Sequence, residues 1–286
     1  PAREEKGGPP RPDGPEDKAP EPLVARLTYP NKAFGVESLP PQNEVLIRHA
    51  TVWTADSAGT IENCDILIKD GFIAEVGPGL AAGDNTEVID AVGKHVTPGI
   101  IDAHSHIAVA GDINEGTHSL TPEVRIGDVI DPEQISIYRQ LAGGVTACLT
   151  LHGSANPVGG QCQVLKLRWG RNAEDMKFRE AAPTIKFAMG ENVKQSNWGM
   201  MMQSRYPQSR MGVTNIMADL FSAAREYEIS WEQYNKLNKK EQAQTIPPRR
   251  DIGLDAVVEL LHNRRWVHCH TYVQSEILAL MRLAEQ

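Results

Sequence analysis

Short apolar runs alternate with helical patterns from Val96 to the end of the chain, and this alternation limits the folds open to it. The apolar runs cover residues 96–106, 145–152, 163–169, 184–190 and 266–270. The helical patterns cover residues 132–142, 214–228, 230–243, 253–263 and 274–285. Strands that are joined through helices form parallel sheets with right-handed crossovers. We therefore expect an α/β region with a parallel sheet of five strands.

Two segments of different composition precede this region. Residues 1–22 consist mainly of Pro, Gly and charged residues, which predicts a disordered arm. Residues 23–96 contain short β-type runs at 45–54 and 65–77, and the second run holds Asp70-Gly71, a two-residue hairpin signal. We interpret residues 23–96 as a small β-sandwich unit and residues 97–286 as a separate α/β domain.

The charge balance and the lengths of the apolar runs exclude some classes of binding partner. The 29 Lys and Arg residues face 37 Asp and Glu residues, a formal net charge of −8, which argues against a broad nucleic-acid surface. No run of about 18 apolar residues exists, so we expect no membrane partner. The four cysteines are widely spaced in apolar stretches, which favours free buried thiols over disulfides. The sequence does not decide between the cytoplasm and export after removal of a signal.

The segment PGIIDAHSH, residues 98–106, carries the clearest chemical pattern. Residues two apart in a strand point to the same face, so His104 and His106 can direct both imidazoles at one metal ion. Asp102 shares that face. The alternative is a pair of strand histidines satisfied by hydrogen bonds, but their place at the end of an apolar strand favours a metal site.

A second pair of histidines ends the last apolar run. In WVHCH, residues 266–270, His268 and His270 again lie on one face of a strand. The alternative is a core strand with chance histidines. Two such pairs in one chain favour a shared metal site.

These segments, together with ILIKDGFIAEVG in the preceding β unit, resemble the amidohydrolase superfamily of metal-dependent hydrolases, and most closely its imidazolonepropionase-like and prolidase-like branches. The resemblance implies a β-sandwich beside a (β/α)8 TIM-type barrel, incomplete in this chain, with one or two divalent ions at the carboxyl ends of the strands. Zinc is the expected ion, with manganese, iron, cobalt and nickel as alternatives. His104 and His106 match the strand-one ligands, and His268 is the better strand-five ligand. His270 would then contact substrate or support a ligand, although the two roles could be reversed.

The resemblance also implies an anion from strand four that bridges two metal ions. It is either a lysine carboxylated by carbon dioxide or a glutamate. Lys186, within the run at 184–190, fits the first version, and Glu191, at its end, fits the second. The pattern does not choose between them, and either residue could instead have no role in the site.

Candidate substrate contacts lie in two loops. The loop at 151–161 offers His152 and Asn156, and its Gly159-Gly160 pair could let the backbone approach a substrate. Simple turn residues are the alternative. Arg205 and Arg210 could hold a substrate carboxylate, although exposed arginines are usually just solvated. The neighbouring residues Met200, Met201 and Met202 are expected in the core, with a flexible lid as the alternative.

The predicted function is hydrolysis of a C–N bond in a cyclic amide, an acylated amino acid or a small dipeptide by metal-activated water. The resemblance also implies a strand-six histidine and a strand-eight aspartate, for which the sequence before Gln286 has no place. We assign the aspartate's role to no residue, since Asp102, Asp112 and Asp251 lie outside a late strand. The alternative function is a fragment or subunit that needs a partner, either a second copy or a complementary chain completing the barrel.

Overall fold

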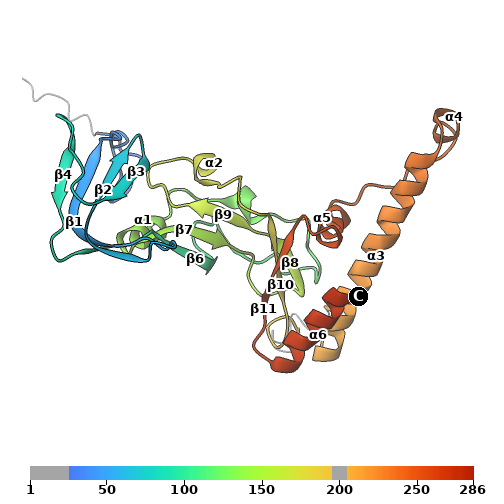
Figure 1. Cartoon of the computed structure of the whole chain (residues 1–286). Helices are drawn as coiled ribbons and strands as arrows, with labels where there is room; N and C mark the ends of the chain where they lie inside the picture. The colour runs from blue at the N-terminus through green and yellow to red at the C-terminus, as the bar shows by residue number, and fades with distance from the viewer. Residues whose placement is uncertain (1–25, 195–204) are drawn as a thin grey trace, which may run out of the picture.

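The computed structural model of the chain describes residues 26–194 and 205–286. The predictions for the arm at 1–22 and for Met200, Met201 and Met202 lie outside the described residues. Figure 1 shows a β-sheet unit at one end of the molecule, two smaller sheets in the middle, and a long helix that projects at the other end.

The first unit is a five-stranded mixed sheet. Its strands are β1 (Val45–Trp53), β2 (Thr60–Lys69), β3 (Phe72–Gly77), β4 (Glu87–Asp90) and β5 (His95–Val96). Strand β1 pairs antiparallel with β2 and parallel with β4 and β5. The predicted hairpin joins β2 to β3, and Asp70 and Gly71 both take positive φ values, as a type I′ turn requires.

This sheet has a small buried core at β1 and β2 and an exposed edge strand, β3. Ala50, Val52 and Cys64 are buried in its core, whereas Phe72 and Ile73 are largely exposed. A sandwich needs a second sheet, and the described part of residues 23–96 forms only one. The sandwich therefore stays a prediction.

The middle of the molecule contains two three-stranded sheets. One has the order β6 (Ile100–Ser105), β7 (Val145–Thr150), β9 (Gln163–Lys166), and the other has the order β11 (Trp266–His270), β10 (Thr184–Ala188), β8 (Val158–Gln161). The pairs β6–β7 and β10–β11 are parallel. The 3₁₀-helix η1 (Ile126–Val129) and helix α1 (Ile135–Ala142) lie between β6 and β7 in the chain, and α5 (Ile252–Leu261) precedes β11.

The prediction of one parallel sheet of five strands is wrong in two respects: the five runs lie in two sheets, and one of them is antiparallel to its neighbour. The run at 163–169 forms β9, which pairs antiparallel with β7, and the loop predicted at 151–161 contains an additional strand, β8. Only Cys162 separates β8 from β9. Strand β9 reaches its neighbour β7 through residues 151–162, which contain β8 and no helix, so the helical crossover expected between parallel neighbours is missing. The sheets of the described residues do not by themselves confirm an incomplete barrel.

Four helices remain among the described residues: the short α2 (Ala173–Met176), the long α3 (Arg210–Lys236), α4 (Lys239–Gln242) and α6 (Gln274–Glu285). Helix α2 packs on the β6–β7–β9 sheet, α3 and α6 pack on the β8–β10–β11 sheet, and α4 follows α3 with no buried residue. The sequence predicts separate helices at 214–228 and 230–243, but α3 continues through residue 229. It does so because no Gly or Pro interrupts the chain there. Met217 of α3 is buried with Phe187 of β10 and Val257 of α5. Within the described residues, no helix is long and apolar enough to cross a membrane.

The outer strands of the two middle sheets leave apolar side chains open to solvent. Strand β6 ends one sheet and exposes Ile100 and Ile101, and β11 ends the other and exposes Trp266 and Val267. Exposed apolar strand edges are uncommon on soluble monomers.

Candidate functional site

The pairing of β10 with β11 brings Lys186 and His268 together. These residues are directly opposite in the parallel register, so their side chains leave the sheet on the same face. Both reach His104 of β6: Lys186 Nζ lies 3.2 Å from His104 Nε2, and His268 Nε2 lies 3.2 Å from His104 Nδ1. With His106 they form what we call the histidine–lysine cluster.

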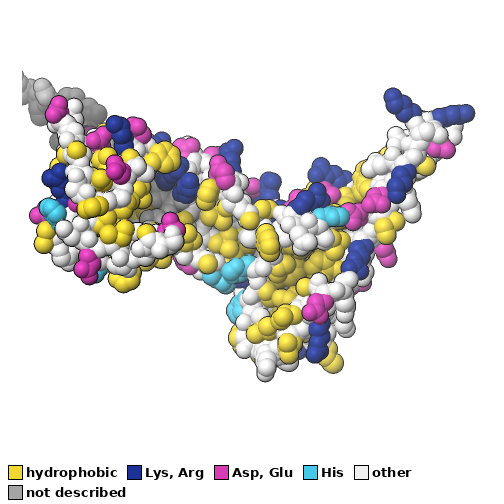
Figure 2. Space-filling model, in the orientation of Figure 1, with side chains coloured by type: hydrophobic (Ala, Val, Ile, Leu, Met, Phe, Trp, Pro, Cys, Tyr) yellow, Lys and Arg dark blue, Asp and Glu magenta, His cyan; other side chains and the backbone are white. Residues whose placement is uncertain are grey.

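His106 joins the cluster through His104. Their ring centroids are 5.2 Å apart and nearly perpendicular. The Nδ1 atom of His106 lies 3.0 Å from the carbonyl oxygen of Leu151, to which it can donate. That donation leaves Nε2 without a proton and able to bind a metal. Figure 2 shows histidine side chains gathered at a notch in the middle of the molecule.

Burial and charge favour the neutral imidazoles of His104 and His268. Burial, and then the positive charge of Lys186, lower the pKa of His104 to about 4. The same two causes lower the pKa of His268. The Lys186 side chain is completely buried, and burial lowers its pKa despite the nearby Cys162 and Cys269. Neutral imidazole is the form that binds metal ions.

The chemistry of the cluster fits a metal site, although its present geometry is not a complete ligand set. No group of three His, Cys, Asp or Glu side chains in residues 26–194 and 205–286 is arranged to hold an ion. Two ligand atoms bound about 2.1 Å from a tetrahedral ion lie roughly 3.4 Å apart. The 3.2 Å contacts of His104 with Lys186 and His268 are close to that spacing, but they use opposite nitrogens of the His104 ring and so do not converge on one ion. The cluster therefore contains neutral nitrogen donors and a buried amine that could become an anionic ligand.

Glu191 and Arg210 lie in an ion-pair network instead. Arg210 Nη2 lies 2.8 Å from Glu191 Oε1, Lys194 Nζ lies 2.8 Å from Glu191 Oε2, and Arg210 also pairs with Glu276. The structure thus does not bring Glu191 to the cluster as it does Lys186. Arg210 already faces two carboxylates, which weakens its predicted role in holding a substrate carboxylate.

His152 and Asn156 are internal residues of the loop after β7. His152 Nε2 accepts a hydrogen bond from Glu115 N at 2.8 Å, and its Nδ1 lies 2.8 Å from Gly153 O. Asn156 is completely buried and donates to Glu115 O at 2.6 Å and to Thr121 Oγ1 at 2.7 Å. Because these polar atoms are satisfied within the chain, the placement does not support direct substrate contact by either residue.

The other predicted loop contacts are also structural. Arg205 donates to Asn156 Oδ1 at 2.8 Å and to backbone carbonyls, including Ala155 O at 2.8 Å. A Cβ on Gly159 would lie 2.7 Å from His152 Nδ1, and one on Gly160 would lie 2.7 Å from Val124 O. These glycines allow close packing within the chain rather than the approach of a substrate.

Ser154 is a site residue that was not among the candidates predicted from the sequence. Its Oγ lies 2.6 Å from Nδ1 of His270, so the loop after β7 holds a histidine at the end of β11. Burial lowers the pKa of His270, and the charge of Lys186 lowers it further. A hydroxyl two residues after His152, in a loop at the carboxyl end of a strand, was the available signal.

Comparison with known proteins gives several relatives. No protein-family model matches the sequence. The chain is 26% identical over 273 residues to Amidohydrolase tasK of Hapsidospora irregularis, an alignment covering 82% of this chain and 27% of that protein. It is 47% identical over 68 residues to the dihydroorotase of Citrifermentans bemidjiense, covering 22% of this chain and 16% of the relative.

A solved structure extends the comparison to the fold. An amidohydrolase from Thermotoga maritima MSB8 superposes with a TM-score of 0.73 at 30% identity. The match covers 84% of this chain and 61% of that structure. The chain therefore spans less than two thirds of each of these relatives.

Proposed function

This chain belongs to the amidohydrolase superfamily, and from that premise we propose that its histidine–lysine cluster is part of the active site of a metal-dependent hydrolase that cleaves a C–N bond. The observation that carries the proposal is the meeting of His104, Lys186 and His268 from three strands. The printed names of the relatives, an amidohydrolase and a dihydroorotase, support this kind of reaction.

In the proposed site His104, His106 and His268 hold one or two divalent ions, with zinc as the first choice. A bound divalent ion lowers the pKa of water to ~7 and polarises the bond under attack. The protein's part is orientation. Leu151 O fixes the ring of His106, Asp102 Oδ1 accepts from the backbone N–H of His104 at 3.1 Å, and Ser154 Oγ holds His270 beside the cluster.

Lys186 is our choice for the bridging anion. Its neutral amine would attack the carbon of carbon dioxide: a C–N bond forms, one C–O π bond opens onto oxygen, and the nitrogen gives one proton to water, which leaves a carbamate anion. A buried amine with a lowered pKa favours this step, because the neutral form is the nucleophile. The carbamate would replace the buried amine with an anionic oxygen ligand.

Metal analysis of the purified protein tests the proposal. We expect at least one bound divalent ion per chain by mass spectrometry, and its loss in His104→Ala and His268→Ala. The matched control is His262→Ala, since His262 lies outside the cluster and pairs with Glu228. Absence of metal, or equal loss in the control, would contradict the proposal. An added mass of one carbon dioxide on Lys186, absent in Lys186→Met, tests the bridge separately.

A second candidate is a subunit that becomes active only with a partner. The open edges of β6 and β11, with Ile101 and Trp266 exposed, favour this candidate. In that case the partner supplies the remaining strands, and the hydrolytic activity belongs to the assembly.

A further inference from the structure

A polar cavity lies away from the histidine–lysine cluster, at the amino end of β10. Its volume is about 340 Å³, within the size range of small-ligand sites. It lies between η1, the β8–β9 connection, the segment after α2 and the start of β10. Four cationic side chains line it: Arg125, Lys177, Arg179 and Arg265.

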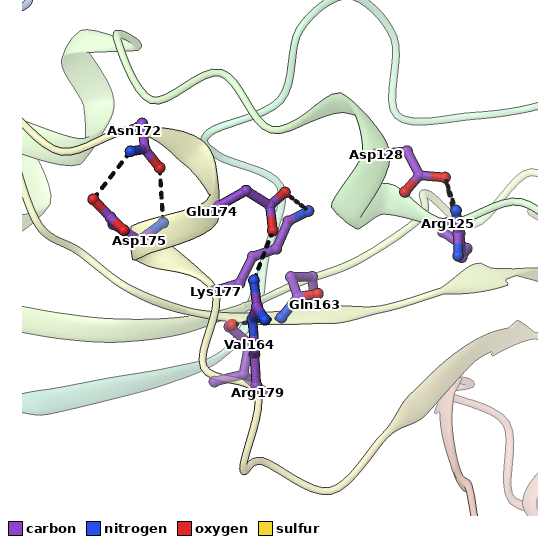
Figure 3. Close-up of polar contacts among 9 residues, drawn as sticks. All are labelled: Arg125, Asp128, Gln163, Val164, Asn172, Glu174, Asp175, Lys177 and Arg179. Carbon is purple, nitrogen blue, oxygen red and sulfur yellow. Dashed lines mark hydrogen bonds and ion pairs between the residues drawn. The ribbon is translucent and has the colours of Figure 1, made fainter.

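The cationic groups outnumber the carboxylates that pair with them. Lys177 and Arg179 share one carboxylate, Glu174, with N–O distances of 2.5 and 3.2 Å. Arg265 pairs with Glu259 at 2.6 Å. Figure 3 shows Glu174 between Lys177 and Arg179. Because one carboxylate neutralises only one of its two cations, this side of the cavity keeps a positive charge.

Two of the cations are held inside the protein. The side chains of Lys177 and Arg265 are only 16% and 10% exposed. A buried cation is stable when anionic groups compensate its lost hydration. Each of these two has a carboxylate partner, at 2.5 and 2.6 Å, and Arg179 is 74% exposed, so an anion in the cavity would add to the existing compensation and also contact Arg179.

The cavity also offers a neutral hydrogen-bond donor. Thr184 lines the cavity, and its Oγ1 is buried with the weakly polar Cys162 thiol as its side-chain neighbour. A hydroxyl can donate to an anion. Arg265 also lies against this residue, since its Nη1 donates to Thr184 O at 3.2 Å.

We propose that this cavity binds a small multivalent anion, a phosphate or a di- or tricarboxylate. Lys177, Arg179 and Arg265 supply the charge, and Thr184 supplies a neutral donor. Arg125, which pairs with Asp128 within one turn, completes the lining. The site is separate from the proposed hydrolytic centre, so it needs neither bound metal nor turnover.

Isothermal titration of the purified protein with inorganic phosphate, and separately with citrate, tests the proposal. We expect saturable binding of at least one probe, weakened about tenfold or more in Lys177→Met and Arg179→Gln. The matched control is Arg171→Gln, which removes an exposed cation of the same region that does not line the cavity. Circular dichroism verifies that each variant is folded.

The outcomes separate clearly. Binding that is weakened by the two cavity variants and unchanged in Arg171→Gln supports the site, and the stronger probe identifies phosphate or carboxylate as the preferred chemistry. No saturable binding of either probe overturns the proposal. Equal weakening in the control also overturns it, because that result would mean a general attraction of anions to the surface.

Discussion

At the scale of single residues, the contact between Ser154 and His270 fixes how one histidine is oriented. We expect Ser154→Ala to change the ring tautomer or orientation of His270, because Nδ1 loses its partner at 2.6 Å. The ¹⁵N NMR shifts of the His270 ring measure this directly, and any amide-hydrolysing activity should fall about tenfold. Ser154→Thr keeps the hydroxyl and should restore both readouts. Unchanged His270 shifts in Ser154→Ala would remove Ser154 from its positioning role.

Asp65 gives a second prediction at this scale, on stability against pH. Burial alone would raise its pKa, but hydrogen bonds from the backbone N–H of His49 and Leu80, with the nearby charges of His49 and Arg48, lower it on balance. A carboxylate with a lowered pKa stabilises the fold above the unfolded-state value of about 3.9. This contribution is lost as the pH falls below that value.

We therefore expect Asp65→Asn to lower the free energy of unfolding at pH 7 by about 1–3 kcal/mol, since one amide N–H loses its acceptor. The difference between variant and wild type should shrink as the pH falls below about 4. Urea unfolding across pH measures both effects. The control is Asp84→Asn, an exposed aspartate outside this contact. A difference that is constant over the whole pH range would contradict the assignment.

At the scale of elements, α3 is joined to the second sheet through its buried face. Met217 is completely buried in the core cluster shared with β10 and α5, whereas Met211 on the same helix is 79% exposed. Met217→Ala leaves a cavity, so it should lower the free energy of unfolding by about 2–5 kcal/mol. Met211→Ala should change it by less than about 0.5 kcal/mol. Similar urea midpoints for the two variants would show that α3 does not depend on this packing.

At the scale of the whole molecule, the exposed edges of β6 and β11 predict association with a second copy. Burying their apolar side chains against another chain would remove the unpaired strand edges. Light scattering should therefore give a mass above that of one chain, and Ile101→Lys and Trp266→Lys should return it to one chain. Ile246→Lys is the control, because Ile246 is 92% exposed away from both edges. A monomeric wild-type protein, or dissociation by the control substitution, would contradict self-association.

The sequence by itself determined the features that depend on local spacing. The alternation in PGIIDAHSH placed His104 and His106 for a common target, and Asp70-Gly71 specified the β2–β3 turn because few residues tolerate its positive φ values. The resemblance to the amidohydrolase superfamily also followed from the sequence. It rests on short motifs such as PGIIDAHSH, each of which can be recognised without knowing its distant neighbours.

The tertiary structure decided what depends on distant neighbours. The register of β10 against β11 brought Lys186, and not Glu191, to His268 and His104. The chain fold buried Asn156 among hydrogen-bond partners. The connection from β7 to β9, residues 151–162, forms strand β8 of the other sheet and no crossover helix, and β9 pairs antiparallel with β7. The alternation of polar and apolar residues in one segment indicates which face of the strand a side chain lies on. It does not indicate which distant segment packs against that face.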